Sequence, residues 1–199
     1  MILLTLDLIG TFAFAITGAV KAAQRELDWF GAFVLALATG TCGGIMRDAL
    51  LGNHPPIALQ QPVYAFVCIT AAILVIVAQK KIISKWRFVL VADAIGLGAF
   101  TAIGAVHAEN AGANGVAIVS LAVLTAVGGG MLRDVLAGEI PQVLKSDFYA
   151  TAALIGGLFF WIFGLFTSDF HEAKVSLTIA ITIILRLYAM RKKLNLPKV

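Results

Sequence analysis

The chain has 199 residues, of which 60% are hydrophobic and 13% are charged. Soluble domains hold about 45–50% apolar and about 25% charged residues, so this composition excludes an ordinary soluble domain and favours an all-α membrane protein. The net charge of +4 does not indicate nucleic-acid binding, because the basic residues stand at the ends of apolar stretches.

Seven apolar stretches predict helices long enough to cross a membrane, which takes ~20 mostly apolar residues. The first begins at Met1 without the basic segment of a signal peptide, so we expect it to be retained. The last has the weakest signal, because its charge-free run is short and Arg186 follows it. We therefore expect one transmembrane domain over residues 1–199, with spans near 2–21, 29–50, 62–79, 88–107, 113–137, 147–167 and 174–190.

Lysine and arginine are concentrated in alternate connections between these stretches. The richer connections and the C-terminus hold Lys21, Arg25, Lys80, Lys81, Lys85, Arg87, Arg133, Lys145, Arg191, Lys192, Lys193 and Lys198. The other connections hold only Arg47 and Lys174. Because basic loops stay in the cytoplasm, we expect a multi-pass protein of the cell (inner) membrane with its N-terminus outside and its C-terminus cytoplasmic.

An internal repeat relates the two halves of the chain. Residues 7–55 align without a gap to residues 93–141, at an offset of 86, and 19 of the 49 positions are identical. Each copy contains three predicted spans, about 2–79 and 88–167, and the seventh helix, about 174–190, has no partner. An odd number of spans per copy inserts the second copy upside down, so we expect an inverted repeat.

Each copy carries a glycine-rich motif on its second span. It contains Gly43 and Gly44 in copy one, and Gly128, Gly129 and Gly130 in copy two. Glycine inside a helix costs ~1 kcal/mol relative to alanine and favours kinks, which a membrane protein tolerates beside a water-filled cavity. Alternatively, small residues let helices pack closely. Two copies at matched positions favour kinks that line a pathway.

Charged residues follow these glycines. Arg47-Asp48 returns as Arg133-Asp134. Adjacent residues on a helix point about 100° apart, so the arginine and the aspartate of one motif need not interact with each other. Each arginine could instead pair with an aspartate of the other repeat, such as Asp7 or Asp93. Two roles remain open for these charged residues: a structural salt bridge, or a charge that faces the pathway.

Two further carboxylates match, because Asp7 returns as Asp93 near the start of each copy. An intramembrane carboxylate is a functional-site hypothesis by default, and a carboxylate facing a wet path attracts cations. The alternative is an acid that only complements the helix dipole. Cys42 and Cys68 fit no metal-ligand spacing, and no nucleophile-and-base pair is present, so we expect no metal, cofactor or enzyme activity.

Two three-helix repeats, each with Gly-Gly-x-x-Arg-Asp on its second helix, and a seventh helix resemble the prokaryotic trimeric intracellular cation (TRIC) channel family. The resemblance covers about residues 2–190. It implies a homotrimer in the lipid membrane with one pore per protomer between the repeats, conducting K⁺ chiefly with Na⁺. It also implies that the motif glycines kink the second and fifth helices, and that Arg47, Asp48, Arg133 and Asp134 lie on or beside the pore.

The chain departs from that family's pattern at two positions. Cys42 stands where copy two has Gly128, so a smaller first kink is expected. Animal members bind a phosphoinositide through a lysine and an arginine one turn apart, whereas Gly129 lies one turn before Arg133 here. Relatives of this domain are also described as glycine transporters, so a small-solute carrier stays as the second hypothesis and a non-transporting scaffold as the third.

Overall fold

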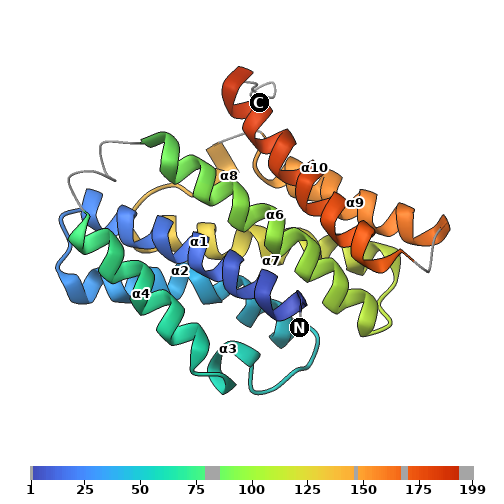
Figure 1. Cartoon of the computed structure of the whole chain (residues 1–199), viewed down its shortest axis with the longest axis horizontal. Helices are drawn as coiled ribbons and strands as arrows, with labels where there is room; N and C mark the ends of the chain where they lie inside the picture. The colour runs from blue at the N-terminus through green and yellow to red at the C-terminus, as the bar shows by residue number, and fades with distance from the viewer. Residues whose placement is uncertain (1, 79–85, 146–147, 167–169, 193–199) are drawn as a thin grey trace.

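The computed structural model describes residues 2–78, 86–145, 148–166 and 170–192, and within these residues the regular structure is entirely α-helical. Figure 1 shows the arrangement. In chain order the helices are α1 (Ile2–Gln24), α2 (Trp29–Leu50), α3 (Ile57–Gln60), α4 (Val63–Val77), α6 (Trp86–Asn110), α7 (Gly115–Leu136), α8 (Gln142–Lys145), α9 (Ala150–Phe166) and α10 (His171–Lys192).

Within the described residues, each predicted stretch contains one of the longer helices, and α1, α6 and α10 extend beyond their predicted ends by two to three residues. Five of them, α1, α2, α6, α7 and α10, are long and apolar enough to cross a membrane, and α4 and α9 are shorter apolar helices. The four-residue helices α3 and α8 were not predicted. Six of the residues that predicted the orientation lie outside the described part of the chain, either entirely or with their side chains: Lys80, Lys81, Lys85, Arg87, Lys193 and Lys198. The predicted span ends at 79, 147 and 167 lie outside as well.

Local structure agrees between the two halves at the offset of 86 residues. Helix α7 begins and ends 86 residues after α2. Asp28 caps α2 by accepting a hydrogen bond from the Gly31 N–H, and Asn114 caps α7 in the same way. Gly52 and Gly138 follow the two helices with φ of 75° and 70°, a left-handed conformation that glycine adopts without strain.

The helices pack around a central pair, α1 and α6, which lie side by side in Figure 1. Helix α2 packs on α1, α7 packs on α6, and α2 and α7 also pack on each other. Helix α4 covers α1 and α2, whereas α9 covers α6 and α7. The unpartnered helix α10 packs on α6 and α9, which both belong to the second half of the molecule.

Contacts between the two halves are reciprocal. Gly10 of α1 packs against Phe100 of α6, and Gly96 of α6 packs against Phe14 of α1. The α2–α7 contact follows the same rule, as described with the site below. In each pair, residue numbers rise on one helix as they fall on the other, so equivalent helices run antiparallel.

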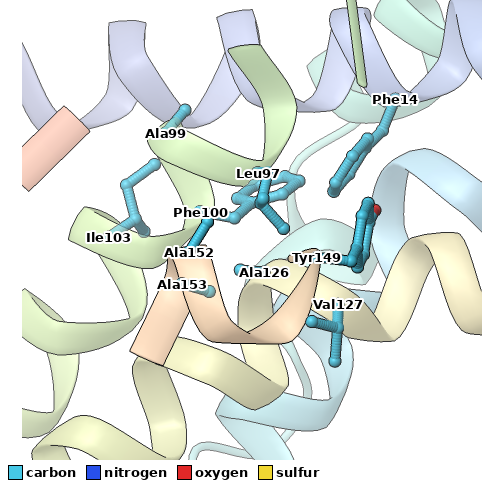
Figure 2. Close-up of a cluster of buried hydrophobic side chains, with 10 residues drawn as sticks. All are labelled: Phe14, Leu97, Ala99, Phe100, Ile103, Ala126, Val127, Tyr149, Ala152 and Ala153. Atoms are coloured by element: carbon cyan, nitrogen blue, oxygen red, sulfur yellow. The ribbon is translucent and has the colours of Figure 1, made fainter. Parts of the chain in front are cut away.

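The core includes an aromatic contact between equivalent residues of α1 and α6. The Phe14 and Phe100 rings lie with their centroids 5.3 Å apart, and both side chains are fully buried. Figure 2 shows them in one cluster with Leu97, Tyr149 and the α9 alanines Ala152 and Ala153. The interior between the halves is therefore filled by side chains at this level.

Candidate functional site

The first charged cluster comprises Asp7, Arg47, Asp48 and Tyr64, from α1, α2 and α4. The Arg47 Nε donates to Asp48 Oδ1 at 2.8 Å, and its Nη1 lies 3.9 Å from Asp7 Oδ2. The Tyr64 hydroxyl donates to Asp7 Oδ2 at 2.8 Å. Asp48 also accepts a hydrogen bond from the Ile57 N–H at the start of α3. All four side chains are buried, so the cluster is an ionic network inside the helix bundle.

The second charged cluster comprises Asp93, Arg133, Asp134 and Tyr149, and it repeats this geometry. The Arg133 Nε donates to Asp134 Oδ1 at 2.9 Å, and its Nη1 lies 2.9 Å from Asp93 Oδ1. Tyr149 donates to the same Asp93 oxygen at 3.3 Å. The Gln142 N–H at the start of α8 donates to Asp134 Oδ2. Two matched networks, each of four residues, thus hold the second helix of each half against its neighbours.

The two networks differ in how tightly the arginine is held. Arg133 Nη1 bonds both Asp93 and the Thr17 hydroxyl of α1, which belongs to the other half. Arg47 Nη1 is buried without a hydrogen-bond partner in the described residues. Copy two has Ile103 at the position equivalent to Thr17, so nothing matches that contact in the first cluster. The sequence alone does not reveal this asymmetry.

The arginines also differ from expectation in their choice of partner. Each bonds the aspartate that follows it, although adjacent side chains point in different directions, because the long arginine side chain folds back over its own helix turn. Each also faces the aspartate of its own repeat, Asp7 or Asp93, rather than that of the other repeat. The cross-repeat partner is Thr17.

The two tyrosines are site residues that the repeat alignment missed. Tyr64 and Tyr149 are 85 residues apart, as are Ile57 and Gln142, whose amides bond the two motif aspartates. Copy two therefore lacks one residue after Pro141, and the ungapped offset of 86 puts each tyrosine opposite a non-tyrosine. Aligning the third helices with a one-residue gap would have found both.

The motif glycines lie where α2 and α7 cross. A β-carbon at Gly43 would overlap the Thr125 carbonyl oxygen, and one at Gly129 would overlap the Thr39 carbonyl oxygen. A β-carbon at Gly130 would lie 2.7 Å from the Tyr149 hydroxyl, and one at Gly128 would lie 3.0 Å from the Met46 sulfur. Gly44 has only the Arg47 Nη2 nearby, at 3.7 Å. Both helices continue through the glycines, so close packing is their visible role.

Two cavities adjoin the clusters. The larger, about 170 Å³, is lined by polar and charged residues that include Thr17, Lys21, Asp93, Arg133 and Asp134. The smaller, about 10 Å³, is lined by Asp7, Thr11, Arg47, Tyr64 and Phe100, among others. A volume of this smaller size holds about one water molecule. Each cluster therefore adjoins a space large enough for about one water molecule or more.

An ion pair stands at the wall of the larger cavity. Glu139, just after α7, accepts hydrogen bonds from Lys21 Nζ at 3.0 Å and from Arg25 Nη2 at 2.6 Å, both at the end of α1. These bonds, led by that from Lys21, lower the pKa of Glu139 below its ordinary value. The first half has Asn53 and His107 at the positions equivalent to Glu139 and Lys21. This charged link therefore belongs to one end of the molecule.

Comparison with known proteins identifies the family. A family model described as "Glycine transporter" matches residues 4–80 and 90–164, two segments that start 86 residues apart. The UPF0126 inner membrane protein YadS of Escherichia coli K12 is 38% identical over 199 residues, 99% of this chain and 96% of the relative. The TRIC channel orthologue from Rhodobacter sphaeroides has a similar structure, with a TM-score of 0.92 and 34% identity over 97% of this chain and 99% of that one. The chain belongs to the prokaryotic TRIC channel family.

A second TRIC structure, solved in work on conductance through TRIC cation channels, agrees with this assignment. It is 38% identical, with a TM-score of 0.89 over 98% of this chain and 96% of that one. The likeness to TRIC channels extends over both charged clusters and α10, because it covers nearly the whole chain. Together with the long apolar helices, it makes this chain an all-helical membrane protein.

Proposed function

We propose that this protein is a passive channel for monovalent cations, K⁺ chiefly and Na⁺ as well, with one pathway in each protomer between its two halves. The observation that carries the proposal is one face of α1. Asp7, Thr11, Phe14, Thr17 and Lys21 follow one another at intervals of three or four residues, so they share a helix face. The first two line the smaller cavity and the last two line the larger.

Phe14 stands between the two cavities on this face. It packs against Phe100, which itself lines the smaller cavity, and both rings are buried. A path that follows α1 would thus be polar at both ends and closed in the middle by two equivalent aromatic rings. Opening requires those rings to part, and we propose that bending at Gly43, Gly44, Gly128, Gly129 and Gly130 provides the movement.

We also propose that the two halves form an inverted repeat of seven spans, with repeat one about 2–79, repeat two about 88–167, and α10 as the seventh span. The reciprocal contacts support it. Gly10 contacts Phe100, and their equivalents Gly96 and Phe14 contact each other as well. Paired contacts of this kind indicate that a twofold axis relates the two halves. Equivalent helices run antiparallel, so in a membrane that axis lies in the membrane plane.

Four buried carboxylates, Asp7, Asp48, Asp93 and Asp134, give this pathway its preference for cations. Carboxylates beside a narrow path attract cations and repel anions. Arg47 and Arg133 each offset part of this charge, and each cluster keeps one formal negative charge from its three ionic residues. All six ionic residues are therefore proposed to act on the ion pathway.

The proposed assembly rests on a relative, and the proposed orientation rests on the distribution of basic residues. The Rhodobacter sphaeroides protein is described as trimeric, so we propose a homotrimer, surrounded by membrane lipid. With the N-terminus outside, the first cluster faces the exterior and the second faces the cytoplasm. The basic residues Lys21, Arg25, Arg191 and Lys192 then lie on the cytoplasmic side.

A glycine-type secondary transporter is the second candidate. The description of the matching family model favours it, and so does one feature of the larger cavity. Three basic and three acidic residues line this cavity, so it offers both positive and negative groups to a small zwitterion. The basic residues are Lys21, Arg133 and Lys145, and the acidic residues are Asp93, Asp134 and Glu139.

Flux into proteoliposomes separates the two candidates. Vesicles that contain the purified protein and a Tl⁺-sensitive dye should quench rapidly when Tl⁺, a K⁺ substitute, is added. The same vesicles should show no saturable counterflow of labelled glycine. Glycine counterflow without Tl⁺ entry would reject the channel in favour of the transporter.

A further inference from the structure

Arg186 brings a buried charge to the second cluster from outside the repeat. It lies on α10, the helix without a repeat partner, and its side chain is 2% exposed. Its guanidinium carbon lies 4.7 Å from the centroid of the Tyr149 ring, and Tyr149 donates to Asp93. It also lies within Coulombic range of Asp93 and Arg133. Arginine stays protonated in proteins, so this residue adds a full positive charge.

Arg186 does not behave as an interfacial arginine. An arginine near a helix end normally extends its side chain to the membrane surface and stays in water. Here the side chain points inward and stacks on an aromatic ring that is itself 1% exposed. Burying a charge inside a membrane protein is expensive, and such residues mark functional sites by default.

The added charge makes the two clusters electrically different. Asp7, Arg47 and Asp48 sum to one negative charge, and Asp93, Arg133 and Asp134 sum to the same value. Beside the second cluster, Glu139 pairs with both Lys21 and Arg25, and Lys145 lines the same cavity, so the surrounding residues already add positive charge at this end. Arg186 adds a further positive charge, and it reaches the second cluster itself through Tyr149.

We propose that Arg186 is a charge-setting residue of the pathway: its positive charge weakens the attraction of the second cluster for cations and so increases the inequality between the two ends of the pathway. As a property of a channel, this rests on the proposed function. It predicts that cations concentrate less at the second cluster than at the first, so that current entering from the end with the second cluster is the smaller. The single-channel current should then rectify in symmetrical KCl.

Cysteine modification measures the local potential without any need for conduction. Gln142 lines the larger cavity, and Gln142→Cys in a Cys42→Ala, Cys68→Ala background places one thiol there. The rates of reaction with a trimethylammonium methanethiosulfonate and with a sulfonate methanethiosulfonate are then compared. Arg186→Gln should raise the cationic-to-anionic rate ratio several-fold, because a positive charge beside the cavity is lost.

Two matched variants test whether charge is the cause. Lys174→Gln removes another buried cation of α10, which pairs with Glu109 at 2.7 Å. Glu109 lies 16 residues from Asp93 on α6, about 24 Å along a helix, so this variant should leave the ratio unchanged. Arg186→Lys keeps the charge and should also keep the ratio. Size-exclusion chromatography and thermal unfolding exclude misfolded samples.

The outcomes separate this inference from the proposed function. A raised ratio in Arg186→Gln alone, together with weaker rectification in bilayers, supports both. A raised ratio in a protein that carries no current supports the role of Arg186 and rejects the channel. An unchanged ratio in folded Arg186→Gln, or an equal rise in Arg186→Lys or Lys174→Gln, overturns the inference.

Discussion

At the scale of residues, the two arginines show how a membrane interior holds charge. Arg47 and Arg133 are both buried, and each bonds the next aspartate in the chain. This bond offsets part of the free energy of desolvation that an isolated buried charge would carry. The tyrosine hydroxyls and the amides of Ile57 and Gln142 donate further hydrogen bonds to the carboxylates. Each cluster is thus a bonded unit and not a set of separate charges.

Removing Arg133 should therefore destabilise the protein strongly. Arg133→Met leaves Asp93 and Asp134 buried without the counter-charge that is hydrogen-bonded to both, and breaking a buried ion pair in this way costs about 3–5 kcal/mol. Unfolding in mixed detergent micelles measures the change. Arg25→Met is the matched control, because its partner Glu139 is partly exposed and such a pair contributes under about 1 kcal/mol. Equal losses in the two variants would contradict the network described here.

Glu139 should give stability a measurable pH dependence. Its folded pKa is lowered by Lys21 and Arg25, so the ion pair stabilises the fold at pH values above the unfolded carboxyl pKa of about 4.3. That contribution is lost as the pH falls through the lower folded value. We expect Glu139→Gln to unfold at a lower temperature than the wild type near neutral pH, with the gap closing in acid. A gap that stays constant down to the lowest pH at which both proteins fold would show that the pair contributes nothing.

At the scale of helices, the sequence predicts most of this molecule because the repeat and the apolar lengths are local signals. The longer helices follow from the apolar stretches, and the matched Asp, Arg and Gly positions follow from the offset of 86. Tyr64 and Tyr149 do not, because a one-residue gap hides them, and Thr17 does not, because its contact with Arg133 joins the two halves. In the sequence, Arg186 only marks the end of the weakest predicted span. Its contact with Tyr149 depends on how α10 packs, so it could not be predicted from the sequence.

The glycines at the α2–α7 crossing give a test at the same scale. Gly43→Ala should force α2 away from the Thr125 carbonyl, and overpacking of this kind typically costs about 1–3 kcal/mol. Gly44→Ala, with open space around it, should be neutral or stabilising, because alanine favours a helix by ~1 kcal/mol over glycine. Thermal unfolding of the two single variants in one detergent compares them directly.

The same glycines connect packing to opening. If α7 bends at its glycines when the path opens, the double variant Gly129→Ala, Gly130→Ala should lower Tl⁺ flux in vesicles that hold equal amounts of folded protein. Normal flux through that folded double variant would leave these glycines with a packing role only.

At the scale of the whole molecule, two equivalent clusters stand at the two ends of one face of α1, and Phe14 and Phe100 close the space between them. Helix α10 breaks this symmetry by adding Arg186 to one end. The proposed pathway therefore has two entrances of similar geometry but different charge, and one central constriction.

The reversal potential of single-channel currents tests the central claim most directly. Purified wild-type protein in a planar bilayer, with a KCl gradient across it, should give unitary currents that reverse close to the K⁺ equilibrium potential. Absence of unitary currents from folded protein, or reversal near the Cl⁻ equilibrium potential, would contradict a cation channel.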